Sequence, residues 1–231
     1  MQQKNISILP SRAAISILLL FAVALNVAAQ GRKMPKGNPN DSIALFKGMA
    51  VSVDLVGPFM LQAGDNGQYE AALKINLKNK YFPTFELGYG KADHRDDLTS
   101  IHYKTSAPYF RIGCDFNLLK NKRSSNRLFA GFRYAYTSYK NNVSLAEFKD
   151  PVWQYPVKWE AYDNSCYYHW LEFVFGVDAK VWGPLHLGWT GRYRKRIAFD
   201  DGIIGNSWYV PGFGKAGNAR LGGTFNVIID I

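Results

Sequence analysis

Cysteine is nearly absent from this sequence: Cys114 and Cys166 are the two examples among 231 residues. Two cysteines are too few for a disulfide scaffold, and no Cys or His pair has the spacing of a zinc site. A glycine-rich phosphate loop and the nucleophile elbow of hydrolases are also missing. The sequence therefore predicts no cofactor, and its four scattered histidines give little support to catalysis.

Long apolar runs are missing apart from Ala13–Ala24, and the mean hydropathy is −0.20. A bundle of membrane-spanning helices is therefore excluded. The apolar run follows Lys4 and Arg12 and precedes the small residues Val27–Ala29, which is the pattern of a cleavable signal peptide over residues 1–29. An uncleaved membrane anchor is the alternative reading of the same run.

Acidic residues are scarce relative to basic ones, at 18 against 28. Loss of Lys4 and Arg12 with the signal peptide leaves a net charge of 26 − 18 = +8. An exported chain rarely meets nucleic acid, so phosphorylated lipid head groups are the expected anionic partners. Export also permits a disulfide, but Cys114 and Cys166 fall on non-adjacent predicted strands at opposite rims, which predicts two free thiols.

Residues 48–231 alternate between apolar and polar side chains, which is the two-residue period of β-strands. The alternation is clearest from Leu171 to Tyr193, where Trp182-Gly183-Pro184 marks a tight turn. The predicted strands are Gly48–Pro58, Gln68–Lys78, Tyr81–Lys91, Ser106–Leu118, Arg127–Tyr139, Leu171–Val181, Leu185–Tyr193 and Gly217–Ile231. Residues 30–47 contain Pro35 and Pro39 and are predicted to form a flexible periplasmic lead-in.

The connections alternate between short and long, and the longest are the predicted loops Lys140–Ser165 and Ile197–Gly214. This alternation is typical of an all-β, eight-stranded antiparallel up-and-down transmembrane β-barrel, with short periplasmic turns and longer outer loops. Both chain ends of the domain at residues 48–231 are then on the periplasmic side. An even strand number also closes the sheet without leaving a bare edge in lipid.

On this pattern, residues 48–231 resemble the small outer-membrane β-barrel proteins of Gram-negative bacteria, the OmpA/OmpX-type class, and more narrowly a family of secreted barrels with this layout and no assigned function. In that class the barrel-assembly machinery reads alternate apolar residues in the last strand. The matching residues are Phe225, Val227, Ile229 and Ile231, with Ile in the place where a terminal aromatic is common. The resemblance implies location in the outer membrane of a Gram-negative bacterium, with membrane lipid and lipopolysaccharide as partners.

The polar parity of the strands is predicted to face the barrel interior, which is just wide enough for side chains to fill. Because unpaired charges there are costly, balanced ion pairs are expected. The candidates are six acidic and six basic residues: Asp54, Glu70, Lys74, Glu86, Arg111, Asp115, Arg133, Glu172, Asp178, Lys180, Arg192 and Arg220. A small conducting pore is the alternative use of the same lumen.

The outward parity carries aromatic residues near the strand ends, which predicts belts at the two membrane interfaces. The candidates are Tyr69, Tyr136, Trp170, Trp182 and Tyr193. Arg194, Lys195 and Arg196 are candidates for contact with lipopolysaccharide phosphates, with solubility or lumen pairing as the alternative. Basic residues of the predicted periplasmic turns, such as Lys120 and Arg123, are expected to meet inner-leaflet head groups.

The predicted function is a non-enzymatic barrel with a structural role, or with a surface-interaction role in which the two long outer loops bind a protein or ligand. One alternative is a lipid A-modifying enzyme that uses His169 and Glu172. The fold-level rival is a soluble secreted barrel that holds an apolar ligand, and it requires the apolar parity inside. The acidic pairs Asp96–Asp97 and Asp200–Asp201 have oxygens suited to a divalent cation, but solvated loop charge explains them, and no metal site is predicted.

Overall fold

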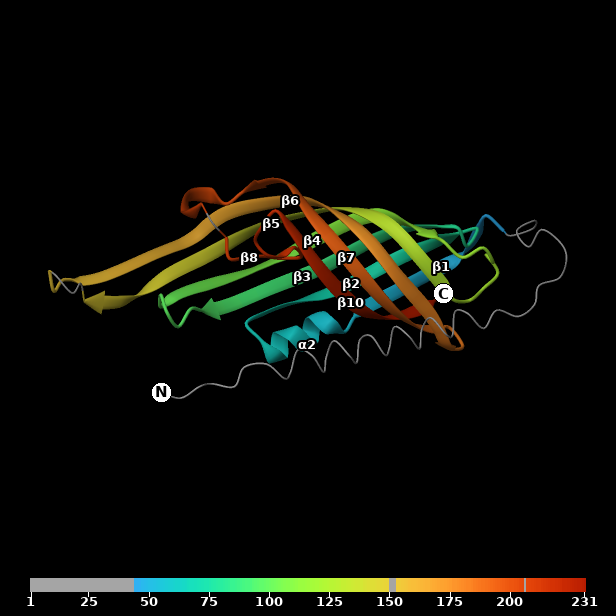
Figure 1. The fold of residues 1–231 in the computed structure, drawn as a ribbon, viewed down its shortest axis with the longest axis horizontal. Helices are drawn as coiled ribbons and strands as arrows, with labels where there is room; N and C mark the ends of the chain where they lie inside the picture. Colours follow the sequence, from blue (N-terminus) through green and yellow to red (C-terminus); the bar gives the residue numbers. More distant parts are fainter. Residues whose placement is uncertain (1–43, 150–152, 206) are drawn as a thin grey trace.

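The computed structural model describes residues 44–149, 153–205 and 207–231, so the predicted signal peptide and most of the lead-in lie outside the described residues. Eight strands form one closed antiparallel barrel in which the order around the wall follows the order in the chain (Figure 1). They are β1 (Phe46–Asp54), β2 (Asn66–Leu77), β3 (Tyr81–Arg95), β4 (Ile101–Asn117), β5 (Arg127–Lys149), β6 (Pro156–Trp182), β7 (Leu185–Asp200) and β10 (Ala219–Asp230). The predicted eight-stranded up-and-down fold is confirmed.

The two ends of the barrel differ. The short connections 78–80, 118–126 and 183–184 close the end at which β1 begins and β10 ends, which we call the turn end. The opposite end, which we call the loop end, carries the hairpin of β5 and β6. That hairpin projects well beyond the other strands in Figure 1, with pairing that extends to Lys149 and Pro156.

The prediction of a loop over Lys140–Ser165 is therefore wrong for most of its length. Both strands of the hairpin continue through this stretch, with two register shifts along the way. Polar residues lie on both faces of this stretch, with Asn141 and Asn164 buried beside the exposed Lys140 and Ser165, so its sequence carries no clean apolar–polar alternation. The predicted loop Ile197–Gly214 is also partly strand, because β7 continues to Asp200.

The remaining elements are short: α2 (Val56–Ala63), the 3₁₀ turn η1 (Gly202–Ile204), and the small sheet of β8 (Tyr209–Val210) and β9 (Gly214–Lys215). The first strand was predicted to continue to Pro58, but β1 ends at Asp54. The Asp54 carboxylate accepts the backbone N–H groups of Val56 at 3.0 Å and Gly57 at 2.9 Å, which favours the start of a helix. Among the described residues, no helix is both long and apolar enough to cross a membrane.

The two parities of the barrel strands have opposite exposure. On β6, Glu172 and Val174 are buried, whereas Leu171 and Phe173 are about half exposed. The exposed apolar set covers the whole wall and includes Val51, Val53, Leu73, Phe85, Leu87, Phe110, Ile112, Phe132, Leu171, Phe173 and Tyr193. The barrel is therefore apolar outside and filled with polar and charged side chains inside.

Trp170 was predicted for an outer aromatic belt, and this placement is wrong. Its side chain is fully buried, and its indole Nε1 donates to Glu172 at 2.7 Å. The two residues share a parity, so the alternation places both inside. Cys114 on β4 and Cys166 on β6 are free thiols on strands separated by β5.

Candidate functional site in the barrel interior

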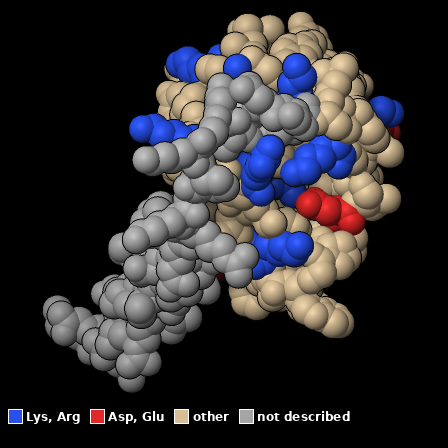
Figure 2. All heavy atoms as spheres, turned by 90° about the vertical axis from the view of Figure 1, so that its right-hand side faces the viewer, with Lys and Arg blue, Asp and Glu red and all other residues tan. Residues whose placement is uncertain are grey.

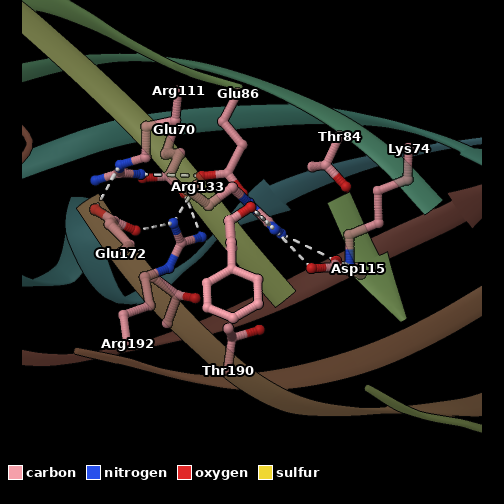
Figure 3. Close-up of polar contacts among 12 residues, drawn as sticks. Glu70, Lys74, Thr84, Glu86, Arg111, Asp115, Arg133, Glu172, Thr190 and Arg192 are labelled. Atoms are coloured by element: carbon pink, nitrogen blue, oxygen red, sulfur yellow. Dashed lines mark hydrogen bonds and ion pairs between the residues drawn. The ribbon is translucent and has the colours of Figure 1, made fainter. Parts of the chain in front are cut away.

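Six charged side chains from six neighbouring strands meet inside the barrel, and we call them the central cluster: Glu70, Glu86, Arg111, Arg133, Glu172 and Arg192. Figure 3 shows their carboxylates and guanidinium groups turned toward one another from different sides of the wall. The strand register helps to produce this arrangement, because Glu86 lies opposite Arg111 and Arg133 lies opposite Glu172. Cross-strand pairs of opposite charge are the expected stabilising neighbours in an antiparallel sheet.

Two arginines each contact all three glutamates of the cluster. The Arg111 guanidinium lies 3.1 Å from Glu86 and 2.9 Å from Glu172, and it also contacts Glu70. The Arg192 guanidinium lies 2.6 Å from Glu86, 2.8 Å from Glu70 and 3.2 Å from Glu172. All five side chains are at most 4 % exposed, so these charges depend on one another rather than on water.

The network continues toward the turn end through Arg133. Its Nε lies 2.9 Å from Glu86, and its two terminal nitrogens donate to Asp115 at 2.6 and 2.9 Å. Lys74 then lies 3.7 Å from Asp115 and 3.5 Å from Asp178. The paired Arg–carboxylate fork is the geometry in which a buried ion pair is strongest. Pairs of opposite charge therefore continue along the barrel axis from the central cluster toward the turn end.

Glycine provides the room that these long side chains need. A Cβ at Gly88 would lie 2.3 Å from the hydroxyl oxygen of Tyr109, which donates to Glu70 at 2.8 Å. A Cβ at Gly131 would lie 2.2 Å from Oδ1 of Asp115. Any larger residue at either position would displace a member of the network, so these inward glycines are part of the packing.

A loop folded into the barrel closes the interior at the loop end. Val210 and Phe213 are fully buried there, and the Phe213 ring packs against Trp170 with ring centroids 5.7 Å apart. The loop is tied to the central cluster because Arg111 donates to the carbonyl oxygen of Gly212 at 2.8 Å. Gly212 has φ +82°, and a Cβ on it would meet the Tyr109 ring at 2.5 Å.

The interior is also closed toward the turn end. Phe82 and Phe129 are each 2 % exposed and lie on the turn-end side of the charged network, with Lys74 Nζ 4.4 Å from the Phe129 ring centroid. A cavity of about 10 Å³ in the interior is lined by Asp54, Glu86 and Arg192 among others. That volume holds about one water molecule.

Most of the predicted lumen residues belong to this network: Glu70, Lys74, Glu86, Arg111, Asp115, Arg133, Glu172, Asp178 and Arg192. Three do not, and their assignment is corrected. Asp54 is buried but bonds backbone N–H groups of α2 and β10. Lys180 is exposed at the turn end. Arg220 is exposed at the loop end, where its guanidinium donates to the carbonyls of Lys215 and Ala216.

Arg194 was predicted to contact lipid phosphates, and this prediction is wrong. Its side chain is buried, its Nε lies 3.3 Å from Glu172, and its Nη1 donates to the carbonyl oxygen of Phe213 at 2.9 Å. The signal was present in the sequence, since Arg194 has the parity of the predicted lumen residue Arg192. Lys195 is exposed on the outer parity, and Arg196 is half-buried.

The residues considered for catalysis do not meet. His169 lies on the outer side of the wall, where the Tyr134 hydroxyl is 2.6 Å from its Nδ1, whereas Glu172 points inside. In the acidic pairs, Asp96 and Asp200 each accept a backbone N–H two residues further on. Within residues 44–149, 153–205 and 207–231, no three His, Cys, Asp or Glu side chains are grouped as metal ligands.

Fold and interior define the class of this protein: a closed, eight-stranded, antiparallel up-and-down β-barrel with an ion-paired interior. The chain belongs to the family described as a domain of unknown function (DUF6048), whose model matches residues 11–230. No curated protein and no solved structure matches the chain. The class therefore comes from the geometry and the family from the sequence, and neither names an activity.

Proposed function

We propose that this protein is a non-enzymatic outer-membrane β-barrel of a Gram-negative bacterium. In this proposal it holds the projecting hairpin of β5 and β6 at the cell surface as an interaction element. The barrel-assembly machinery inserts it, and its lipid partners are lipopolysaccharide outside and phospholipid inside. A cleaved signal peptide over residues 1–29 exports it.

The observation that carries the proposal is the reversed distribution of polarity across the wall. Leu87, Phe132 and Leu171 are 69, 60 and 49 % exposed on the outside, while Arg111, Arg133 and Glu172 are at most 2 % exposed inside. In water this arrangement would leave a continuous apolar belt unprotected and would bury charges without need. In a bilayer, hydrocarbon covers the belt, and the ion pairs fill the lumen.

The closed interior favours a structural role over transport. The inserted loop, the central cluster and the layer of Phe82 and Phe129 leave a cavity of about 10 Å³ between them. A hydrated ion needs a continuous water path, which this packing does not offer. We therefore expect no steady conductance from the barrel in a planar bilayer.

The turn end has the charge expected of a face that meets anionic head groups. Figure 2 views this end and shows Lys and Arg gathered over the visible surface, with few acidic groups among them. A hollow of about 360 Å³ there is lined by Lys47, Arg127, Lys180 and His186, with Asp230 as its one acidic residue. Inner-leaflet phosphates are partners that such a face would attract.

The projecting hairpin supplies the proposed interaction surface. Trp153, Tyr155, Trp159 and Tyr162 are 72, 70, 47 and 61 % exposed around its tip. Exposed aromatic residues gathered on one projecting element are typical of binding surfaces, because each contributes a large, rigid contact area. The hairpin projects beyond the barrel wall (Figure 1), and in the proposed orientation it lies beyond the membrane surface.

Two measurements on the full chain test the proposal. Folded barrels resist detergent and migrate differently on a gel before and after boiling, so we expect heat-modifiable migration together with recovery in the outer-membrane fraction. Proteinase added to intact cells should then cleave the hairpin tip near residue 153 and leave the barrel core undigested. Full solubility without detergent would contradict the membrane assignment, and discrete conductance steps would contradict the structural role.

A further inference from the structure

The barrel wall is incompletely paired at one place. Strand β10 pairs with β1 only from Asn226 to Asp230. The last backbone hydrogen bond between these two strands runs from Leu55 N to Phe225 O at 2.9 Å. Strand β2 pairs with β1 only from Ala71 to Leu77. The backbone edges of 219–224 and 66–70 therefore face each other across a gap in the strand ladder.

Helix α2 occupies the β2 side of this gap. A Cβ at Gly57 would lie 2.0 Å from the carbonyl oxygen of Gln68, and a Cβ at Gly67 would lie 2.6 Å from Leu61. Helix and strand are thus in direct contact through two glycines. Residues of α2 and of β10 both line the open space that remains beside this contact.

A cleft of about 560 Å³ fills that open part, which is a volume typical of small-molecule sites. Its walls are Val56 and Met60 of α2 and residues 220–223 of β10, and its floor includes the buried Tyr209 and Phe213. Residues of both parities of β10 line it. The cleft therefore passes through the wall from the exposed apolar surface toward the loop that closes the lumen.

The cleft is basic as well as apolar. Arg194, Lys215 and Arg220 line it, and Asp54 is its one acidic residue. The Asp54 carboxylate is held by the backbone N–H groups of Val56, Gly57 and Phe225, and the cleft carries three positive charges against this one negative charge. Arg194 shares Glu172 with the arginines of the central cluster, which leaves its charge incompletely balanced.

The height of the cleft fits a head group. A tilted transmembrane strand needs about 9–11 residues to cross hydrocarbon, and β1 has 9 between the turn end and Asp54. In the proposed orientation the cleft therefore begins where hydrocarbon ends in the outer leaflet. Unpaired backbone edges are tolerable at that level, whereas deeper in the membrane they would be costly.

We propose that the gap between α2 and β10 is a lateral binding site for a membrane lipid with a phosphorylated head group, which enters from the bilayer. The phosphate lies among Lys215, Arg220 and Arg194, and the upper part of an acyl chain lies along Val56, Met60 and Leu221. This proposal rests on the proposed membrane location and specifies a ligand class and its binding position in the barrel wall.

Equilibrium binding to the full mature chain in detergent micelles tests the site, with titration calorimetry as the readout. The probes are dioleoyl phosphatidic acid, dioleoylglycerol with the same chains, and inorganic phosphate. We expect saturable binding of phosphatidic acid only. The double substitution K215Q/R220Q should weaken it about fivefold for each charge removed, or roughly 25-fold together.

A second variant blocks the cleft without removing charge. A Cβ at Gly223 meets only the Thr190 carbonyl oxygen, at 3.7 Å, so G223W fits the backbone and should fill the cleft, with at least about a tenfold loss of affinity. Matched controls are K91Q and L171W, which change exposed outward positions on β3 and β6 and should leave binding unchanged.

The outcomes separate this site from the membrane assignment. Heat-modifiable migration of every variant, with phosphatidic acid binding equal in wild type, K215Q/R220Q and G223W, would overturn the lateral site and leave the barrel intact. Equal binding of inorganic phosphate would reduce it to an anion site and also overturn it. Wild-type protein that shows no heat-modifiable migration would overturn the membrane assignment, and the site with it.

Discussion

Glu86 is the most informative position at which to test the role of the charged interior. Its carboxylate lies 3.1 Å from Arg111, 2.9 Å from Arg133 and 2.6 Å from Arg192, and its side chain is 1 % exposed. The substitution E86Q keeps the shape of the side chain and removes the charge. Three buried guanidinium groups then share one carboxylate fewer.

The expected loss of unfolding free energy is about 3–5 kcal/mol, because removal of one partner from a buried ion pair leaves the other charge uncompensated. With a urea dependence of about 2 kcal/mol/M, the unfolding midpoint should fall by about 2 M. The assay is urea unfolding of the refolded barrel in micelles, followed by tryptophan fluorescence and by heat-modifiable migration on a gel. E160Q on the exposed hairpin is the matched control and should leave the midpoint unchanged.

A double-mutant cycle separates charge balance from packing. R133Q alone should also destabilise, but E86Q and R133Q together remove one charge of each sign from the network. The loss of unfolding free energy in the double variant should therefore be smaller than the sum of the two single losses by at least about 1 kcal/mol. An E86Q midpoint equal to wild type, or strictly additive losses, would refute the view that these groups act as one balanced network.

Two further predictions concern the loop end. The hydrogen bond from His102 lowers the pKa of Asp93. The contact should therefore stabilise the hairpin of β3 and β4 at a pH above the ordinary carboxyl pKa, and this stabilisation should be lost as the pH falls through the lowered pKa. Proteolysis of that hairpin should increase in acid for wild type and change less in D93N. G212A places a Cβ 2.5 Å from the Tyr109 ring at φ +82°, which should cost about 1–3 kcal/mol and loosen the inserted loop, seen as faster cleavage of residues 207–216 by added protease.

The barrel could be predicted because its wall has two distinct faces. Where one face is exposed and apolar and the other packs charges, each strand alternates, and Gln68–Lys78 and Leu171–Val181 show it plainly. The same alternation placed the members of the central cluster on one parity. Their mutual distances were not predictable, because contacts such as Glu70 to Arg192 join β2 to β7 across the lumen, and no local pattern encodes them.

The loop end was predicted poorly for the opposite reason. In the upper parts of β5 and β6 polar residues lie on both faces, for example Asn141 and Asn164 buried and Lys140 and Ser165 exposed, so the sequence shows no clean apolar–polar alternation. The inserted loop carries Val210 and Phe213, whose burial depends on a return of the chain into the barrel mouth that turn residues alone do not specify. Helix α2 was missed because Val56–Ala63 is mainly apolar without a clear period, and its start depends on the carboxylate of Asp54.

The placement of charge inside the barrel also bears on why its seam differs from the rest of the wall. Because side chains alternate, a one-residue slip would turn every inward Arg and Glu of a strand to the outer face. In the proposed membrane this would cost about 2–4 kcal/mol for each Arg or Lys near the midplane. Register is therefore strongly specified on β2 to β7, each of which carries a buried charge of the network.

The closing strands, β1 and β10, carry no member of the central cluster. The inward parity of β10 over its paired length holds Arg220, Gly222, Thr224, Asn226, Ile228 and Asp230, and β1 contributes Ala50, Ser52 and Asp54. Three of them are charged. Asp54 bonds the first backbone N–H groups of α2, Arg220 is exposed at the loop end, and Asp230 pairs with Arg127 at the turn end, so none belongs to the central cluster. The seam of β1 and β10 thus joins the two strands without a central-cluster residue over the shortest paired length in the wall, and α2 and the basic cleft lie beside this seam.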